Sequence, residues 1–232
     1  MSLLCIVAHP DDAGIFCGGT LAKHADRGDD VAVVHMTRGE YGGTDKEEQE
    51  LARRRVEEAR AATEILGVDT GFLDFEDGRV TYSLEARLAL VEVVRGHEPH
   101  AIVTHYSDDM HPDHRVTSEL VSDAYYMASL PLVETENPPH DPENVYYFGK
   151  PTSTFEPNTY VDITGYTDRK ERAIECHESQ VEFLQQHGGI DAEFDDLLRN
   201  VRAETRVYGN EAGVDHAERF LSLHETSTAY LP

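Results

Sequence analysis

Short apolar runs alternate with helical patterns along most of this chain, and this alternation limits its possible folds more than any other feature. Each run is rich in branched or aromatic residues, which favours strands. Alternating strands and helices predict the α/β class: a three-layer, Rossmann-like fold whose mostly parallel sheet carries helices on both faces. We predict strands at Leu3–Ala8, Val31–Met36, 71–75, 100–104, 144–149 and 159–164.

The segments between these runs have helical periodicity. We predict helices at Ile15–Arg27, Lys46–Leu66, Leu84–Arg95, Val116–Met127, Asp168–Gln186 and Ala192–Ala203. A chain of 232 residues is long enough for one full core, so we expect a single domain, 1–232. The irregular region Pro131–Asn144 contains four prolines. We expect it to be a loop on the substrate side, with a linker as the alternative.

Charge and cysteine content narrow the classes of partner and compartment. The formal net charge is -25, which disfavours nucleic acid and anionic membranes as partners. We find no apolar run near the ~20 residues that span a bilayer, and no basic-then-apolar leader, so membrane insertion and secretion are not expected. The three cysteines have no paired spacing, which indicates reduced thiols and a cytoplasmic location.

The acidic surface is also poor in lysine. The basic residues are 16 arginines and only four lysines, a balance typical of a halophilic protein from a salt-rich cytoplasm; an acidic mesophile protein is the alternative. Salt screens repulsion between like charges, with a Debye length of ~3 Å at 1 M. We therefore expect the melting temperature to rise between low and molar potassium chloride. Thermal melts across that range test this, and a flat or falling melting temperature would contradict the halophilic interpretation.

Two polar clusters follow predicted strands. His9, Asp11 and Asp12 come directly after the first strand, and "HYSDDMHPDH" (105–114) follows the fourth. Functional sites of doubly wound sheets lie beyond the carboxyl ends of the strands, so the two clusters can converge on one crevice. Adjacent carboxylates repel each other unless a cation holds them. Two histidines and one aspartate would satisfy a catalytic zinc, with the second carboxylate available as a base.

These residues carry a family resemblance. "VAHPDD", "GIFCGGTLA", "TRGEYGG", "RVEEARAATEILGV", "FLDFEDG", "HPDH" and "VDITGYTDRKERAIECHESQ" occur in that order and span nearly the whole chain. The sequence resembles the PIG-L/LmbE-like family of zinc-dependent N-acetylglucosaminyl deacetylases, and within it the glucosaminyl-malate deacetylase branch. The resemblance implies a hydrolase that removes the N-acetyl group from an amino-sugar conjugate, a small molecule. It also implies a homo-oligomer, either a trimer or a hexamer.

The resemblance implies a metal site as well. His9, Asp12 and His114 match the family's zinc ligands. Zn²⁺ is the expected cofactor, although two histidines and a carboxylate also accept other divalent transition metals. Many relatives carry a glutamate after HPDD where this chain has Ala13 and Gly14, so a carboxylate near the metal is missing here.

Further positions match the family's catalytic residues. Asp11 resembles the general base, and His111 resembles the residue that stabilises the oxyanion. Asp113 would orient His111, and Arg55 would face the sugar. Some relatives place a tyrosine with an acid-base role where this chain has Asp109, so that role would fall to Asp11 or His111.

Two other functions remain open at this point. One is a metal-dependent hydrolase of another amide or an ester, acting through the same residues. The other is a non-catalytic metal- or sugar-binding relative. Because a protein that only binds a ligand needs no spare base, the presence of Asp11, His111 and His114 argues for catalysis.

Overall fold

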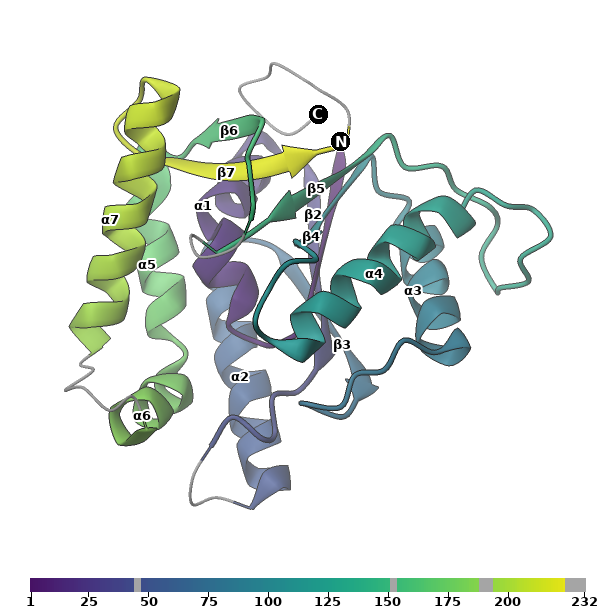
Figure 1. Cartoon of the computed structure of the whole chain (residues 1–232), viewed down its shortest axis with the longest axis horizontal. Coiled ribbons are helices and arrows are strands. Elements are labelled where there is room, and N and C mark those ends of the chain that lie inside the picture. Colours follow the sequence, from purple (N-terminus) through teal and green to yellow (C-terminus); the bar gives the residue numbers. More distant parts are fainter. Residues whose placement is uncertain (44–46, 151–153, 188–193, 224–232) are drawn as a thin grey trace.

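A computed structural model shows a seven-stranded sheet in the residues that the structure describes, which are 1–43, 47–150, 154–187 and 194–223. The strands are β1 (Ser2–Val7), β2 (Asp30–Thr37), β3 (Asp69–Phe75), β4 (Ala101–His105), β5 (Asn144–Phe148), β6 (Thr159–Asp162) and β7 (Ala217–Ser222). Their order is β3-β2-β1-β4-β5-β7-β6. β1 to β5 pair in parallel, and β7 runs antiparallel to both of its neighbours (Figure 1).

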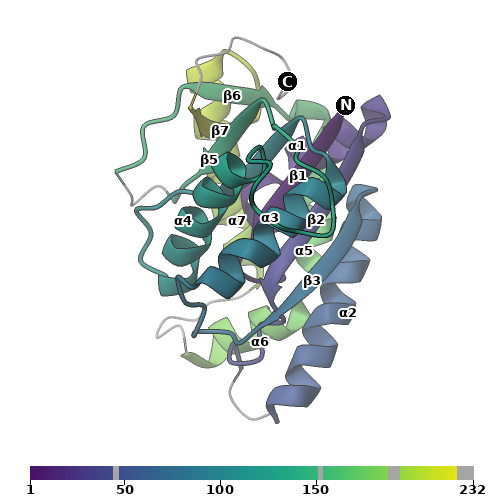
Figure 2. The ribbon, with the colours of Figure 1, turned by 90° about the vertical axis from the view of Figure 1, so that its right-hand side faces the viewer.

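Helices cover both faces of this sheet. They are α1 (Asp12–Arg27), α2 (Glu48–Leu66), α3 (Leu84–His97), α4 (Pro112–Met127), α5 (Thr167–Glu175), α6 (Glu178–His187) and α7 (Phe194–Ala212), with a short 3₁₀ turn at Thr164–Tyr166. α3 and α4 lie on one face, and α1, α2 and α5 lie on the other (Figures 1 and 2). The predicted three-layer α/β fold is confirmed. Among the described residues, the helices lack the combination of length and apolar character that crossing a membrane requires.

β1 is apolar at every position from Leu3 to Val7 because it has a hydrophobic core on each of its two faces. Leu3, Cys5 and Val7 point into the core beneath α1 and α2, whereas Leu4 and Ile6 point into the core beneath α3 and α4. Side chains alternate along a strand, so a central strand with helices on both sides needs apolar residues at every position.

The connectivity of the sheet places its switch point at β1. From β1 the chain adds β2 and β3 on one side, and it then returns to place β4 on the other side. The carboxyl ends of β1 and β4 are therefore neighbours. Ligand sites of open α/β sheets lie at such a point. This topology brings the two polar clusters together.

The single helix predicted at Asp168–Gln186 is wrong, because α5 and α6 are separate. Glu58 of α2 accepts hydrogen bonds from the backbone N–H of Ser179 (2.9 Å) and from its Oγ (2.5 Å). A carboxylate that contacts the first turn of a helix satisfies an N–H group that lacks a helical partner, which favours the start of a new helix at this point. Two other predicted helices begin at Lys46 and Ala192, which lie outside the described residues.

The region Pro131–Asn144 does not lie on the substrate side, so that expectation is wrong. Arg95 in the last turn of α3 donates to the carbonyl groups of Leu130 (2.8 Å) and Val133 (2.8 Å). The backbone N–H of Glu143 donates to the carbonyl of His100 (2.8 Å), just before β4. The region is thus anchored at the amino end of β4, opposite to the site. β7 was not among the predicted strands.

Candidate active site

The two polar clusters meet at the carboxyl ends of β1 and β4. β1 ends at Val7, and the turn that follows it is held by Asp12, whose Oδ2 accepts the backbone N–H of His9 (2.7 Å). α4 starts at Pro112, a residue whose fixed φ and missing N–H suit the first helical position. His111 therefore lies at the cap of α4, and His114 lies in its first turn.

The three predicted metal ligands lie close together. Nδ1 of His9 is 3.2 Å from Nε2 of His114 and 3.4 Å from Oδ2 of Asp12. Oδ1 of Asp12 lies 3.3 Å from the same nitrogen of His114. All three side chains are buried. Donors held about 2.0–2.1 Å from a tetrahedral zinc would be about 3.3 Å apart. The separations found here are close to that value, although His9 and His114 lie near different oxygens of Asp12.

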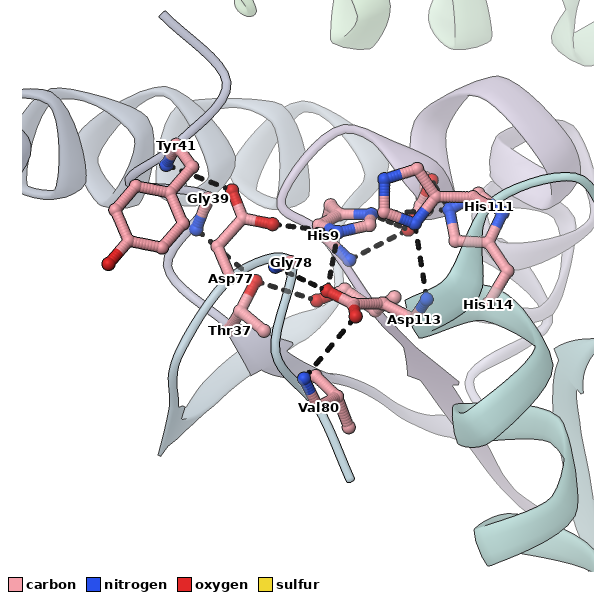
Figure 3. Close-up of polar contacts among 12 residues, drawn as sticks. His9, Thr37, Gly39, Tyr41, Asp77, Gly78, Val80, His111, Asp113 and His114 are labelled. Atoms are coloured by element: carbon pink, nitrogen blue, oxygen red, sulfur yellow. Dashed lines mark hydrogen bonds and ion pairs between the residues drawn. The ribbon is translucent and has the colours of Figure 1, made fainter. Parts of the chain in front are cut away.

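Carboxylates contact the other ring nitrogen of His9. Oδ1 of Asp77 lies 3.1 Å from Nε2, and Oδ2 of Asp113 lies 3.4 Å from it (Figure 3). Burial lowers the pKa of His9, but hydrogen bonds to Asp113, Asp12 and Asp77 outweigh it and raise this pKa well above its usual value. When the proton of His9 is on Nε2, Nδ1 keeps its lone pair, and this atom faces Asp12 and His114. Carboxylates commonly orient metal-binding histidines in this way.

Asp77 was not among the predicted site residues. It follows β3 in "FEDG", and its Oδ2 accepts the backbone N–H of Tyr41 (3.0 Å), which ties the loop after β2 to the site. Burial raises the pKa of Asp77, but the hydrogen bond to His9, the charges of His9 and Arg55 and the N–H of Tyr41 together outweigh burial and lower this pKa. Its position in the sequence could have indicated this role. An acidic residue just after β3 lies at the same edge of the parallel sheet as the residues that follow β1 and β4.

His105, the last residue of β4, is a second residue that the sequence analysis missed. Its Nε2 accepts the backbone N–H of Ala8 (3.0 Å) and lies 3.3 Å from Oδ2 of Asp12. Burial lowers the pKa of His105 to about 4. Burial acts to raise the pKa of Asp12, but its interactions with the His114 and His105 rings outweigh burial and hold this pKa well below its usual value. Since the lone pair on Nε2 of His105 accepts a backbone N–H, we do not place this residue in the proposed ligand set.

Asp11 and Arg55 form a buried ion pair. Nη2 of Arg55 lies 2.7 Å from Oδ1 of Asp11, and Nη1 donates to the carbonyl of Gly39 (2.9 Å). Gly39 has φ 71°, and a Cβ there would lie 2.5 Å from the guanidinium carbon, so glycine is required. Arg55 was predicted to face the sugar. It lines the same cavity as Asp11, and its described contacts hold Asp11.

The structure places Asp113 differently from the role predicted for it. Its carboxylate accepts the backbone N–H groups of Gly78 (2.7 Å) and Val80 (3.3 Å), as Figure 3 shows. Its backbone N–H donates to Nδ1 of His111 (3.3 Å). The carboxylate therefore fixes the loop after β3 and His9, whereas the contact with His111 is made by the backbone. Burial lowers the pKa of His111, and the charges of His9 and His114 lower it further.

These side chains open into one cavity of about 480 Å³. Its polar wall contains the donor set, Asp11 and His111. Its lining also includes the apolar side chains of Ile15, Phe16 and Leu197. The cavity can therefore hold a small molecule that places a polar reacting group at the donor set and an apolar part against these side chains.

Comparisons with known proteins agree with this geometry. The family model described as PIG-L, GlcNAc-PI de-N-acetylase, matches residues 4–125. A diacetylchitobiose deacetylase of Thermococcus kodakarensis is 38% identical over 189 residues, covering 77% of this chain and 69% of that protein. A 4-oxalmesaconate hydratase of Pseudomonas putida is 30% identical over 227 residues, covering 89% and 82%. The solved N,N'-diacetylchitobiose deacetylase of Pyrococcus horikoshii aligns with a TM-score of 0.83 at 29% identity, covering 96% and 83%.

Proposed function

Because the chain belongs to the PIG-L family, we propose that it is a metal-dependent hydrolase that removes the acetyl group from an N-acetylglucosamine-containing small molecule. The name of the Thermococcus relative supports this substrate class. One structural observation carries the proposal: His9, Asp12 and His114 form a compact donor set, and a second carboxylate, that of Asp11, is held beside it by Arg55.

In this proposal Nδ1 of His9, the carboxylate of Asp12 and Nε2 of His114 hold the metal. A bound zinc would polarise the amide carbonyl and lower the pKa of a water molecule toward ~7. Zinc is the ion that we propose, and a donor set of this type also admits other divalent transition metals.

Asp11 is the general base. Arg55 holds its Oδ1, which fixes the carboxylate and leaves Oδ2 to take a proton from the attacking water. The same oxygen then returns this proton to the nitrogen of the departing amine. Because Arg55 is buried and bound to the carbonyl of Gly39, the base keeps one orientation through both transfers.

His111 stabilises the developing oxyanion. Its Nδ1 accepts the backbone N–H of Asp113, so a neutral imidazole carries its proton on Nε2. This N–H is a hydrogen-bond donor at the edge of the cavity. The lowered pKa of His111 favours this neutral form, which donates from Nε2.

Acetate release from N,N'-diacetylchitobiose and from N-acetylglucosamine tests the proposal. We expect release by the metal-loaded protein, loss of release after chelator treatment, and recovery when Zn²⁺ is added back. Chelator-resistant release would contradict the metal-dependent mechanism. Absence of release from a panel of N-acetylglucosamine conjugates by zinc-loaded protein would overturn the substrate class.

A hydratase is the second candidate, because the Pseudomonas relative that carries this name aligns over most of both chains. A hydratase also needs an activated water molecule and a base, so the same residues could serve it. The two functions differ in their products. Addition of water to a carbon–carbon double bond releases no acetate and removes the absorbance of a conjugated substrate, so 4-oxalmesaconate, the compound in that relative's name, provides the parallel assay.

A cytoplasmic location and assembly into a trimer or hexamer are further parts of this proposal. The location is supported by the three cysteines, which are all unpaired, two of them buried. The assembly is supported by the family resemblance drawn from the sequence.

A further inference from the structure

Asp109 links the loop before α4 to the first turn of that helix. Its Oδ1 accepts the backbone N–H of His111 (2.8 Å), and its Oδ2 lies 3.1 Å from Nδ1 of His114. Only 6% of the Asp109 side chain is exposed. One carboxylate thus contacts both histidines of the HPDH motif, the first through its backbone and the second through its ring.

The contact with His114 determines which ring nitrogen can bind a metal. A carboxylate accepts hydrogen bonds, so the partner of Oδ2 is a protonated Nδ1. In that form Nε2 of His114 keeps its lone pair, and this atom lies 3.2 Å from Nδ1 of His9 and 3.3 Å from Oδ1 of Asp12. The opposite form would direct a lone pair at the Asp109 carboxylate and an N–H at the donor set.

The position of Asp109 is itself fixed by the sheet. Lys150 follows β5, and its Nζ lies 3.5 Å from Oδ1 of Asp109. β5 pairs with β4 in parallel register, so the ends of these two strands hold the lysine and the aspartate near each other. The lysine offsets the negative charge that Asp109 adds near Asp12.

We propose that Asp109 is a positioning residue that selects the metal-binding form of His114 and thereby sets the affinity of the site. This inference rests on the metal site of the proposed function. Residues that orient a metal-binding histidine typically contribute about 10–100-fold to metal affinity.

The test is the zinc affinity of the full-length protein, measured by competition with a chromophoric chelator. Asp109→Asn removes the charge, and its amide can either donate to or accept from Nδ1, so the selection is lost. We expect its dissociation constant for Zn²⁺ to rise by about 10–100-fold. Asp108→Asn is the matched control, because Asp108 is the preceding residue and its carboxylate contacts Thr154. We expect it to bind zinc as the wild type does.

A double-mutant cycle separates positioning from a general structural role. If Asp109 acts through His114, then Asp109→Asn adds no further loss of zinc affinity in a His114→Ala background, where the weak binding left to His9 and Asp12 is titrated directly at raised zinc concentrations. A loss that persists in that background, or an unchanged affinity of Asp109→Asn, would overturn the inference. This titration uses no substrate. A wild type that binds zinc without releasing acetate would therefore contradict the proposed function alone.

Discussion

Replacement of Asp11 by Asn is expected to leave bound zinc near the wild-type level while slowing deacetylation by about 10²–10⁴-fold, the usual contribution of a positioned general base. The amide has the size of the carboxylate, and its oxygen can still accept a hydrogen bond from Nη2 of Arg55. It cannot take a proton from water. Acetate release and metal content, measured by plasma mass spectrometry on the same samples, check both parts.

Glu58→Gln is the matched control for this variant. Glu58 is also a buried carboxylate that pairs with an arginine, since its Oε1 lies 3.0 Å from Nε of Arg54. It lies outside the donor set. We expect it to keep its turnover. Full activity in Asp11→Asn would refute the base assignment. Loss of zinc in Asp11→Asn together with retention in Asp12→Ala would mean that the two aspartates have exchanged roles.

Replacement of Asp12 by Ala is expected to remove the metal and the activity together. The change deletes one of three proposed ligands. Loss of a residue that only orients a ligand weakens metal binding by about 10–100-fold, and we expect the loss of zinc affinity here to be larger. His114→Ala should behave in the same way. His111→Ala should keep its zinc and lose turnover, since its proposed partner is the oxyanion. Zinc content after gel filtration, beside the rate of acetate release, distinguishes the two patterns.

A second Asp12 variant is needed because Asp12 also holds the turn after β1, where it accepts the backbone N–H of His9. Asp12→Asn keeps an oxygen for this hydrogen bond and loses the charge, so it separates metal ligation from the shape of the turn. Asp26→Ala, at the far end of α1, controls for loss of an aspartate from that helix. Zinc retained at the wild-type level in both Asp12 variants would remove Asp12 from the ligand set.

The sequence anticipated the elements that depend on local burial. The apolar run Leu3–Ala8 corresponds to β1 (Ser2–Val7), and Gly67 ends α2 with φ 77°. The family followed from the two HPD motifs, and the comparisons confirm it. The sequence also predicted that His9, Asp12 and His114 would meet, and their ring and carboxylate atoms do so. Their roles, like those of Asp11, His111, Asp113 and Arg55, stay predictions.

Elements whose pattern depends on distant partners were missed. The sequence of β7 gives only a weak strand signal because it contains Glu218. This charged residue is buried, and its partners are distant in the sequence. Its carboxylate accepts the backbone N–H groups of Gly19 (3.0 Å) and Thr20 (2.7 Å) in α1 and pairs with Lys170 of α5 (2.5 Å). A buried charge is tolerated only where such partners satisfy it. The hydrophobic periodicity of the sequence does not indicate which distant residues will be these partners.

By itself the sequence determined the α/β layering and the placement of two ligand-rich turns at the carboxyl ends of strands, because each depends on the order of apolar and polar residues along the chain. Only the tertiary structure decided which ring nitrogens of His9 and His114, and which oxygen of Asp11, are left to face the site. Asp77 on His9, Asp109 on His114 and Arg55 on Asp11 make that choice. The reason is physical: the orientation of a buried imidazole or carboxylate follows its hydrogen-bond partners, and for His9 and Asp11 packing brings those partners from other elements of the fold.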